Sequence, residues 1–291
     1  MRGKRIVCLL LCLAVLASFA AAEEETDYAS VTRLNLGQQR MSYGAVKSLL
    51  EQYPNLEKVD MYATPLTGTQ ADELAALYPQ VEFGWTLKIG TDHLVRTDAT
   101  AFSTLHRSGT PGHYTKEMRV LRYCKKLKAL DFGHNYVDDI SWLTELPELR
   151  VLIIAINKIT DLTPLAGLEK LEYLEVFSNR VTDISPLQGL THLMDLNICY
   201  NRITDFTPLY GMTWLKRLWI NRAADRGEPG VPQDVIETLQ KKLPSTEINW
   251  QAQPTLGGWR EHPHYDVIHE MFAGYSYIPF SDSYPDGEDR P

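Results

Sequence analysis

Three twelve-residue stretches share one pattern: NKITDLTPLAGL at 157–168, NRVTDISPLQGL at 179–190 and NRITDFTPLYGM at 201–212. Each begins 22 residues after the one before it, and apolar residues recur with the same period. One apolar column consists of Leu127, Leu149, Leu171, Leu193 and Leu215, and another of Leu130, Leu152, Leu174, Leu196 and Leu218. Self-similarity at a fixed period of this size predicts a solenoid, in which successive coils stack and share one core.

Each unit reads L-x-x-L-x-L and then reaches an asparagine, which gives the column Asn135, Asn157, Asn179 and Asn201. The alternating apolar residues predict a short strand with one buried face. An asparagine amide has both a donor and an acceptor, so it can pair with backbone groups that a turn leaves inside the coil. We therefore expect a structural ladder of buried asparagines.

The return half of each unit carries Pro164, Pro186 or Pro208, each preceded by Ser or Thr. This order predicts a helix cap followed by proline in the first helical position, opening a short helical or extended return. The prolines exclude one continuous amphipathic helix, because an interior proline costs about 3 kcal/mol.

The three quoted stretches resemble the 22-residue leucine-rich repeats of bacterial proteins, of which internalins are the best-known example, and the likeness covers about a third of the chain. The resemblance implies an α/β solenoid of leucine-rich repeats, curved and right-handed, with a parallel sheet on its concave side. It also implies a binding protein, because members of this family bind other molecules, usually proteins, on the curved surface.

The flanking sequence predicts five parts. They are a signal peptide at 1–22, irregular N-terminal repeats at 23–112, the regular repeats at 113–223, a C-terminal capping unit at 224–250 and an aromatic tail, rich in proline and glycine, at 251–291.

Within these parts, strands are expected at 31–36 and 56–61, a longer strand from 81, and a strand near 99–105. Helices are expected at 43–53, 115–126, 233–243 and 266–272. A capping box is expected at 69–72. The irregular repeats and the final unit should cap the solenoid, whose end coils would otherwise expose the core.

The first 22 residues have the features of a secretory signal. Arg2, Lys4 and Arg5 precede an apolar run that ends in small residues, and the run is too short to span a bilayer comfortably. We expect a secreted, soluble protein without membrane insertion, with attachment to the cell surface left open. Cleavage leaves 26 Lys and Arg against 37 Asp and Glu, a charge of −11. That charge excludes nucleic acid as the expected partner.

Cys124 and Cys199 are the cysteines that remain after cleavage. They lie about three coils apart, on the order of 14 Å at ~4.8 Å per strand, which is beyond disulfide reach. Two free thiols are therefore expected, and free thiols favour a bacterial exported protein over a disulfide-dense ectodomain. The protein is also expected to be a monomer.

Candidate chemistry is sparse. His262, His264 and His269 lie near Glu261, Asp266 and Glu270, but their spacing matches no defined metal site. The column Asp139, Asp161, Asp183 and Asp205 is explained by turn hydrogen bonds. No nucleophile or phosphate-loop motif stands in a convincing context. We expect no catalytic, cofactor or metal site, and hence no enzyme.

Side chains between the strand leucines should face the concave side, and many of them are apolar or aromatic. The predicted ligand-binding residues are Val151, Ile153, Ile156, Tyr173, Glu175, Phe177, Asp195, Asn197, Tyr200, Arg217 and Trp219. Aromatic side chains with a polar rim are typical of protein or peptide recognition. Two alternatives stay open. The aromatics could bind carbohydrate, or the tail or the loop at 223–232 could cover the patch and use it as internal packing.

Overall fold

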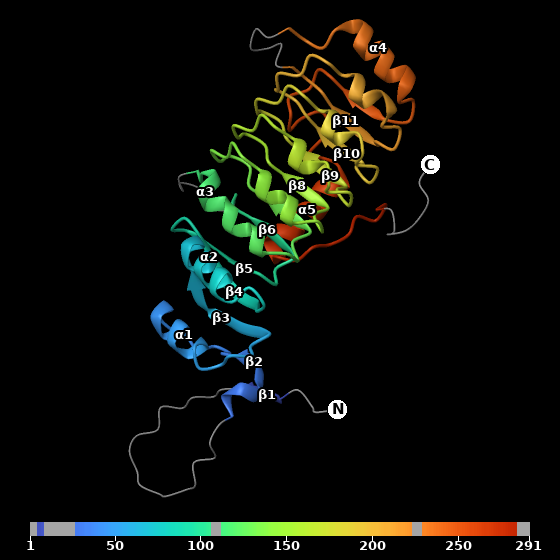
Figure 1. Cartoon of the computed structure of the whole chain (residues 1–291). Coiled ribbons are helices and arrows are strands. Elements are labelled where there is room, and N and C mark those ends of the chain that lie inside the picture. Colours follow the sequence, from blue (N-terminus) through green and yellow to red (C-terminus); the bar gives the residue numbers. More distant parts are fainter. Residues whose placement is uncertain (1–4, 9–26, 106–111, 223–228, 284–291) are drawn as a thin grey trace, which may run out of the picture. The chain divides into compact units, whose positions relative to one another are not determined.

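The computed structural model describes residues 5–8, 27–105, 112–222 and 229–283, which fall into two compact units divided between Thr97 and Asp98. The second unit contains the repeats. Its sheet has seven parallel strands in the order β12-β11-β10-β9-β8-β7-β6 (Figure 1). The strands are β6 (Ala101–Ser103), β7 (Ala129–Asp131), β8 (Val151–Ile153), β9 (Tyr173–Glu175), β10 (Asp195–Asn197), β11 (Arg217–Trp219) and β12 (Glu247–Asn249).

The register of this sheet confirms the period. Val151 pairs with Tyr173, Tyr173 with Asp195, and Asp195 with Arg217, so neighbouring strands are offset by one repeat. The leucine columns are buried, with Leu130, Leu152 and Leu174 all at 0% exposure. The repeat region is therefore the predicted solenoid of leucine-rich coils with a parallel sheet.

The asparagine ladder is confirmed. The amide nitrogen of Asn157 donates to the carbonyl of Phe132 in the preceding coil at 3.0 Å and to Ile154 in its own coil at 3.2 Å. Its Oδ1 accepts from the N–H of Val137 at 2.9 Å. Asn179 and Asn201 make the equivalent bonds. Each amide thus joins two coils and satisfies backbone groups that would otherwise be buried without partners.

Short helices form the returns. They are α3 (Thr115–Met118), η2 (Arg119–Tyr123), η3 (Ser141–Glu145), η4 (Thr163–Leu165), η5 (Ser185–Leu187) and η6 (Thr207–Gly211), and proline stands in the first turn of η4, η5 and η6.

The expected hydroxyl cap is wrong, because Thr163 is already helical and no side chain caps η4 through its N-cap residue. Instead Oδ1 of Asp161 accepts from the N–H of Thr163 at 2.8 Å. Asp183 and Asp205 do the same in their coils, so the aspartate column is structural.

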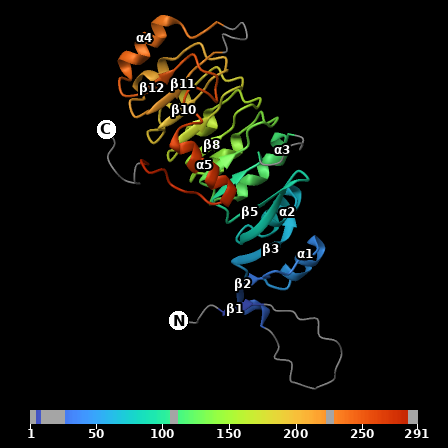
Figure 2. The ribbon, with the colours of Figure 1, turned by 180° about the vertical axis from the view of Figure 1, so that it is seen from behind.

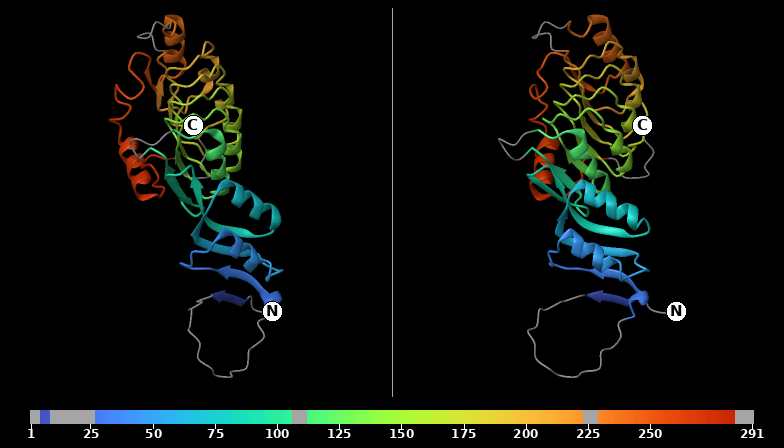
Figure 3. Two further views of the ribbon diagram at one scale, coloured as in Figure 1. Left: turned by 90° about the vertical axis from the view of Figure 1, so that its left-hand side faces the viewer. Right: turned by 60° about the vertical axis from the view of Figure 1, so that its left-hand side comes forward.

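The array continues into a different kind of coil. Helix α4 (Gln233–Lys242) leads into β12, which pairs with β11. Beyond it lies α5 (Pro263–Gly274), which covers the predicted helix at 266–272 and begins three residues earlier. Figures 2 and 3 show α5 on the side of the sheet opposite the return helices.

The first unit has its own five-stranded sheet, in the order β1-β2-β3-β4-β5, with β5 antiparallel to β4. Its elements are β1 (Arg5–Cys8), η1 (Tyr28–Ser30), β2 (Val31–Asn35), α1 (Tyr43–Leu50), β3 (Lys58–Leu66), α2 (Gly68–Leu77), β4 (Glu82–Ile89) and β5 (His93–Arg96). The predicted alternation of strands and helices is confirmed.

The structure differs from the expected organisation in two details, and a third part of it lies largely outside the described residues. The capping box is formed by Thr67 and Gln70, two residues before the expected position. The two units have separate sheets, and β6 pairs with β7, so the regular sheet begins before the expected boundary at 112/113. Most of the predicted signal peptide, residues 1–4 and 9–22, lies outside the described residues. Among the residues that are described, no helix has the length and apolar character to cross a membrane.

Candidate binding surfaces

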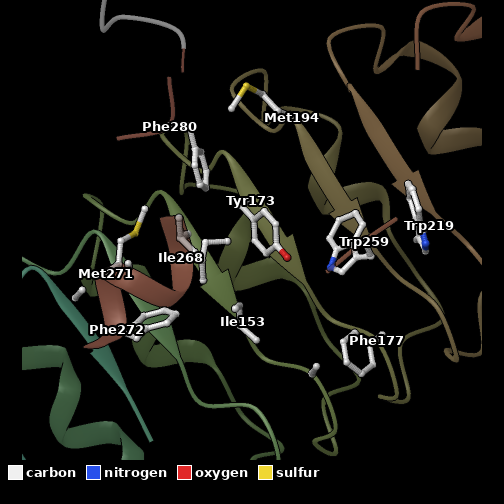
Figure 4. Packing of buried hydrophobic residues seen from close by; sticks show 14 of the residues in the cluster. Ile153, Tyr173, Phe177, Met194, Trp219, Trp259, Ile268, Met271, Phe272 and Phe280 are labelled. Atoms are coloured by element: carbon white, nitrogen blue, oxygen red, sulfur yellow. The ribbon is translucent and has the colours of Figure 1, made fainter. Parts of the chain in front are cut away.

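The concave face of the repeat unit is covered by the tail (residues 251–283). Trp259 lies between Tyr173 and Trp219, with ring centroids 5.4 and 5.2 Å away (Figure 4). Each of these three side chains is 0% exposed. The tail also contributes Ile268, Met271, Phe272 and Phe280 to the same apolar cluster. The sheet therefore has a core on both faces, one made by the leucine columns and one made with the tail.

Polar groups of the face are paired with the same segment. Glu175 accepts from the indole Nε1 of Trp259 at 2.8 Å and from Arg260 at 2.7 Å, and the Tyr173 hydroxyl also donates to it. The amide of Asn197 donates to the carbonyl of Pro254 at 2.7 Å. These bonds satisfy polar atoms that would be costly to leave unpaired in an apolar core.

A second polar cluster surrounds Asp195. Its carboxylate accepts from Nε of Arg217 at 2.8 Å and lies 2.5 Å from Nδ1 of His264. The other ring nitrogen of His264 lies 2.6 Å from Asp282, which is also bonded to Lys216 at 2.7 Å.

Burial favours the neutral forms of His264, Asp195 and Asp282, but the hydrogen bonds and opposite charges of their partners outweigh this effect. The pKa of His264 is raised and that of Asp195 is lowered, and Asp282 has a pKa of about 2. Each ring nitrogen of His264 thus faces a carboxylate, an arrangement that favours the charged form of the imidazole.

Ligand atoms of Asp195, His262 and His264 lie within 4.8 Å of one another, a separation at which a metal site is conceivable. However, Nδ1 of His262 already accepts from the backbone N–H of His264 at 3.2 Å. Both nitrogens of His264 are bonded to carboxylates, and the Arg217 guanidinium adjoins Asp195. The lone pairs that a cation needs are engaged, so these residues join the tail to the sheet. His269 is exposed on α5.

The prediction of an open ligand-binding concave face is wrong for nine of its eleven residues, which are buried. They are Val151, Ile153, Tyr173, Glu175, Phe177, Asp195, Asn197, Arg217 and Trp219. The alternative of internal packing under the tail is the correct one, while residues 223–228 of the loop lie outside the described residues. The carbohydrate alternative loses its support as well, because the aromatics on which it rested are enclosed.

A different column of the same repeats stays outside. Tyr114, Tyr136, Lys158, Arg180 and Arg202 are spaced by 22 residues and follow one another along the edge where the strands end. We call them the carboxyl-edge column. Tyr114 and Tyr136 are 53% and 45% exposed, with ring centroids 5.3 Å apart. Nζ of Lys158 lies 5.0 Å from the centroid of the Tyr136 ring, a cation–π contact.

The neighbouring column has unusual backbone geometry. His134, Ile156, Ser178 and Tyr200 have φ between 54° and 59°, the left-handed region. This conformation is unfavourable for a β-branched residue, yet Ile156 adopts it and is 38% exposed. Ile156 and Tyr200 are the two predicted ligand-binding residues that keep contact with solvent. Both lie in the turn that follows the strand, beside the carboxyl-edge column.

Comparison with known proteins agrees with the repeat assignment. Residues 147–189 and 169–210 match the family model described as Leucine Rich repeats (2 copies). No curated protein sequence matches the chain.

Solved structures that resemble it include an internalin, inlF, from Listeria monocytogenes, with 22% identity, 76% of this chain and 54% of that chain covered, and a TM-score of 0.45. A leucine-rich-repeat protein from Leptospira interrogans gives 19% identity, 76% and 55% coverage, and a TM-score of 0.44. The chain thus spans about half the length of these two proteins, and no functional argument follows from the likeness.

The coils, the asparagine ladder and the matching repeats define the class: residues 147–210 are leucine-rich repeats, and the repeat unit folds as a leucine-rich-repeat solenoid. Its fold is that of a protein-interaction module, a class that is typically non-enzymatic.

Proposed function

We propose that this chain is an exported bacterial binding protein that acts as a monomer and recognises a protein partner through the carboxyl edge of its repeat unit. Export is supported by the basic, apolar and small-residue order of residues 1–22. The edge is proposed in place of the concave face because the tail occupies that face.

The observation that carries the proposal is the cluster of Tyr114, Tyr136 and Ile156. Three large apolar side chains are 53%, 45% and 38% exposed on adjacent coils, although the same repeats have buried columns available for such residues. Tyrosines that are exposed together on a rigid scaffold are typical of binding hot spots. Ile156 adds backbone strain, which persists where function requires a residue that stability disfavours.

Site-specific photo-crosslinking tests this function. A benzophenone amino acid replaces Tyr136 in one variant and the exposed Gln188, on the return side of the coil, in a matched control. We expect a discrete crosslinked protein adduct at position 136 and none at position 188. Excess of the same chain without the benzophenone amino acid should abolish the adduct by competition. Equal adducts at both positions, or none at Tyr136, would contradict recognition at the edge.

Export has its own test, the N-terminal sequence of the protein recovered from the culture medium. Cleavage near residue 22 is expected, and retention of intact Met1 inside the cell would contradict it.

A further inference from the structure

The cationic half of the carboxyl-edge column is a row of three positively charged side chains on successive coils. Among the residues that the structure describes, Lys158, Arg180 and Arg202 form no ion pair, and Arg180 and Arg202 are exposed. Some other lysines of the unit have ion-pair partners, such as Lys125 with Glu145 and Lys170 with Glu148. What distinguishes Lys158, Arg180 and Arg202 is that they occupy the same position on three successive coils and so form a row of positive charge.

The columns on either side are mostly uncharged, with Asp138 as the exception: the hydrogen bond from Thr115 and, less strongly, the charge of Lys158 lower the pKa of its carboxyl. Toward the strands the neighbours are Ile156, Ser178 and Tyr200, and on the other side they are Thr160, Thr182 and Thr204. The next column, which includes Asp161 and Asp183, directs its carboxylates to backbone N–H groups of the turns. A row of like charges on a chain with net charge −8 is repulsive within itself and attracts a local negative group.

We propose that the carboxyl-edge column binds an extended acidic segment of the partner protein. An apolar residue of the segment packs against Tyr114, Tyr136 and Ile156, and the carboxylates that follow pair with Lys158, Arg180 and Arg202. This inference rests on the proposed function and adds the chemistry of the partner to it.

The dimensions fit such a segment. Lys158 and Arg202 are two coils apart, roughly 10 Å at ~4.8 Å per strand, which is about three residues of extended chain at ~3.3 Å each. Carboxylates on alternate residues therefore fall within reach of the long cationic side chains, and the planar guanidinium groups can hold them with two hydrogen bonds.

A protein segment is favoured over a polyanion by the shape of the charge distribution. The cations form one short row that ends in aromatic and aliphatic side chains, whereas a nucleic acid or an anionic polymer needs a broad basic footprint. The overall negative charge of the chain opposes a long polyanion but acts weakly on a short segment within a Debye length of the row.

The experiment uses the full chain and a fluorescent peptide in which Ile-Tyr-Gly is followed by alternating glutamate and serine. The test variant is Lys158→Glu, Arg180→Glu, Arg202→Glu. The control is Lys126→Glu, Lys241→Glu, Lys242→Glu, which makes the same change in net charge at exposed positions of the same unit. We expect the glutamate peptide to bind the test variant at least tenfold more weakly than the unmodified chain and to bind the control variant with little change. A peptide with lysine in place of glutamate should restore binding to the test variant.

Three outcomes would overturn the inference. They are equal losses in the test and control variants, no binding of the peptide to the unmodified chain, and tighter binding of heparin or phosphatidylglycerol vesicles than of the peptide. The Tyr136 crosslink separates this inference from the proposed function. If the adduct persists unchanged in the charge-reversed chain, protein recognition at the edge stands and the acidic segment is excluded.

Discussion

The concave face and the carboxyl-edge column come from the same 22-residue units, and both point away from the leucine core. Yet Tyr173 and Trp219 are 0% exposed on the first, while Tyr114 and Tyr136 are about half exposed on the second. The difference is made by the tail, which follows no repeat and lies on one surface only. A position that faces outward from its own coil is therefore a free surface only if no other part of the chain packs on it.

The largest expected effect comes from removing the tail's central aromatic residue. Trp259→Ala deletes a fully buried indole and leaves Glu175 without one of its hydrogen-bond donors, so the free energy of unfolding should fall by about 3–5 kcal/mol. Urea unfolding followed by circular dichroism measures it. The matched change on the edge, Tyr136→Ala, should cost about 1 kcal/mol or less. Similar losses for the two variants would remove the distinction between the surfaces.

The covered face should also make stability depend on pH through Asp131. Burial raises the pKa of this carboxyl from 3.8 to about 7, with the bond from the Gly133 N–H and nearby Glu175 as smaller influences. Because the folded-state pKa exceeds the unfolded one, the contribution of Asp131 to stability is fully present below about pH 4 and is lost as pH rises to about 7, by up to about 4 kcal/mol. The raised pKa of His264 extends this decline in stability to higher pH.

Thermal unfolding of Asp131→Asn against the unmodified chain between pH 4 and 8 isolates this contribution. The difference in melting temperature should grow in favour of the variant as pH rises. A constant difference across that range would show that Asp131 ionises in the folded protein as it does in the unfolded chain.

An intermediate effect is expected inside the coils, where neither surface is involved. Asn179→Ala removes hydrogen bonds to Ile154, Val176 and the N–H of Ile159, and should cost roughly 1–3 kcal/mol. Equilibrium unfolding measures the loss. Asp183→Ala in the same coil, which removes one exposed turn bond, should cost less. The reverse order would contradict the structural role assigned to the ladder.

The smallest expected effect is a gain. Ile156→Asn replaces a β-branched residue at φ 55° with one that tolerates the left-handed conformation, and should raise stability by about 1 kcal/mol. The same variant should weaken partner recognition at the edge, measured by the yield of the Tyr136 crosslink. Ser178→Asn, at the equivalent position one coil later, should leave that yield unchanged. A stabilised Ile156→Asn chain with full crosslinking would mean that the strain has no part in binding.

The period alone was sufficient to predict the coils, the ladder and the returns, because each depends on residues within one or two repeats. It could not predict the covering of the face. Glu175 and Trp259 are 84 residues apart and no spacing rule connects them. The sequence pattern of aromatic residues on a strand face is the same whether a ligand or the chain's own tail packs on them. Charge gives no guidance either, since Glu175 and Asp195, two of the predicted ligand-binding residues, pair with Arg260 and His264 of the tail.

The carboxyl-edge column, by contrast, was available in the sequence. Tyr114, Tyr136, Lys158, Arg180 and Arg202 keep the 22-residue interval, and the position lies between two buried columns. The sequence does not show which outward-facing column stays exposed, because the strand positions on the concave side also point away from the leucine core. What the sequence lacked was the backbone angle of Ile156, since a left-handed turn with a β-branched side chain is not encoded by any preference of isoleucine.

The two thiols of the repeat unit are both fully buried, but only Cys199 belongs to the apolar cluster that the tail covers. Cys124 belongs to the leucine side of the coils, whereas Cys199 lies under the tail, where its sulfur accepts from the N–H of Asn221 at 3.2 Å. Burial raises the pKa of Cys199 to about 12, so alkylation has to wait for an opening event. The alkylation rates of the two cysteines in the unmodified chain therefore report on two different opening events. The rate at Cys199 measures how often the tail moves away from the sheet, and the rate at Cys124 measures how often the coils separate.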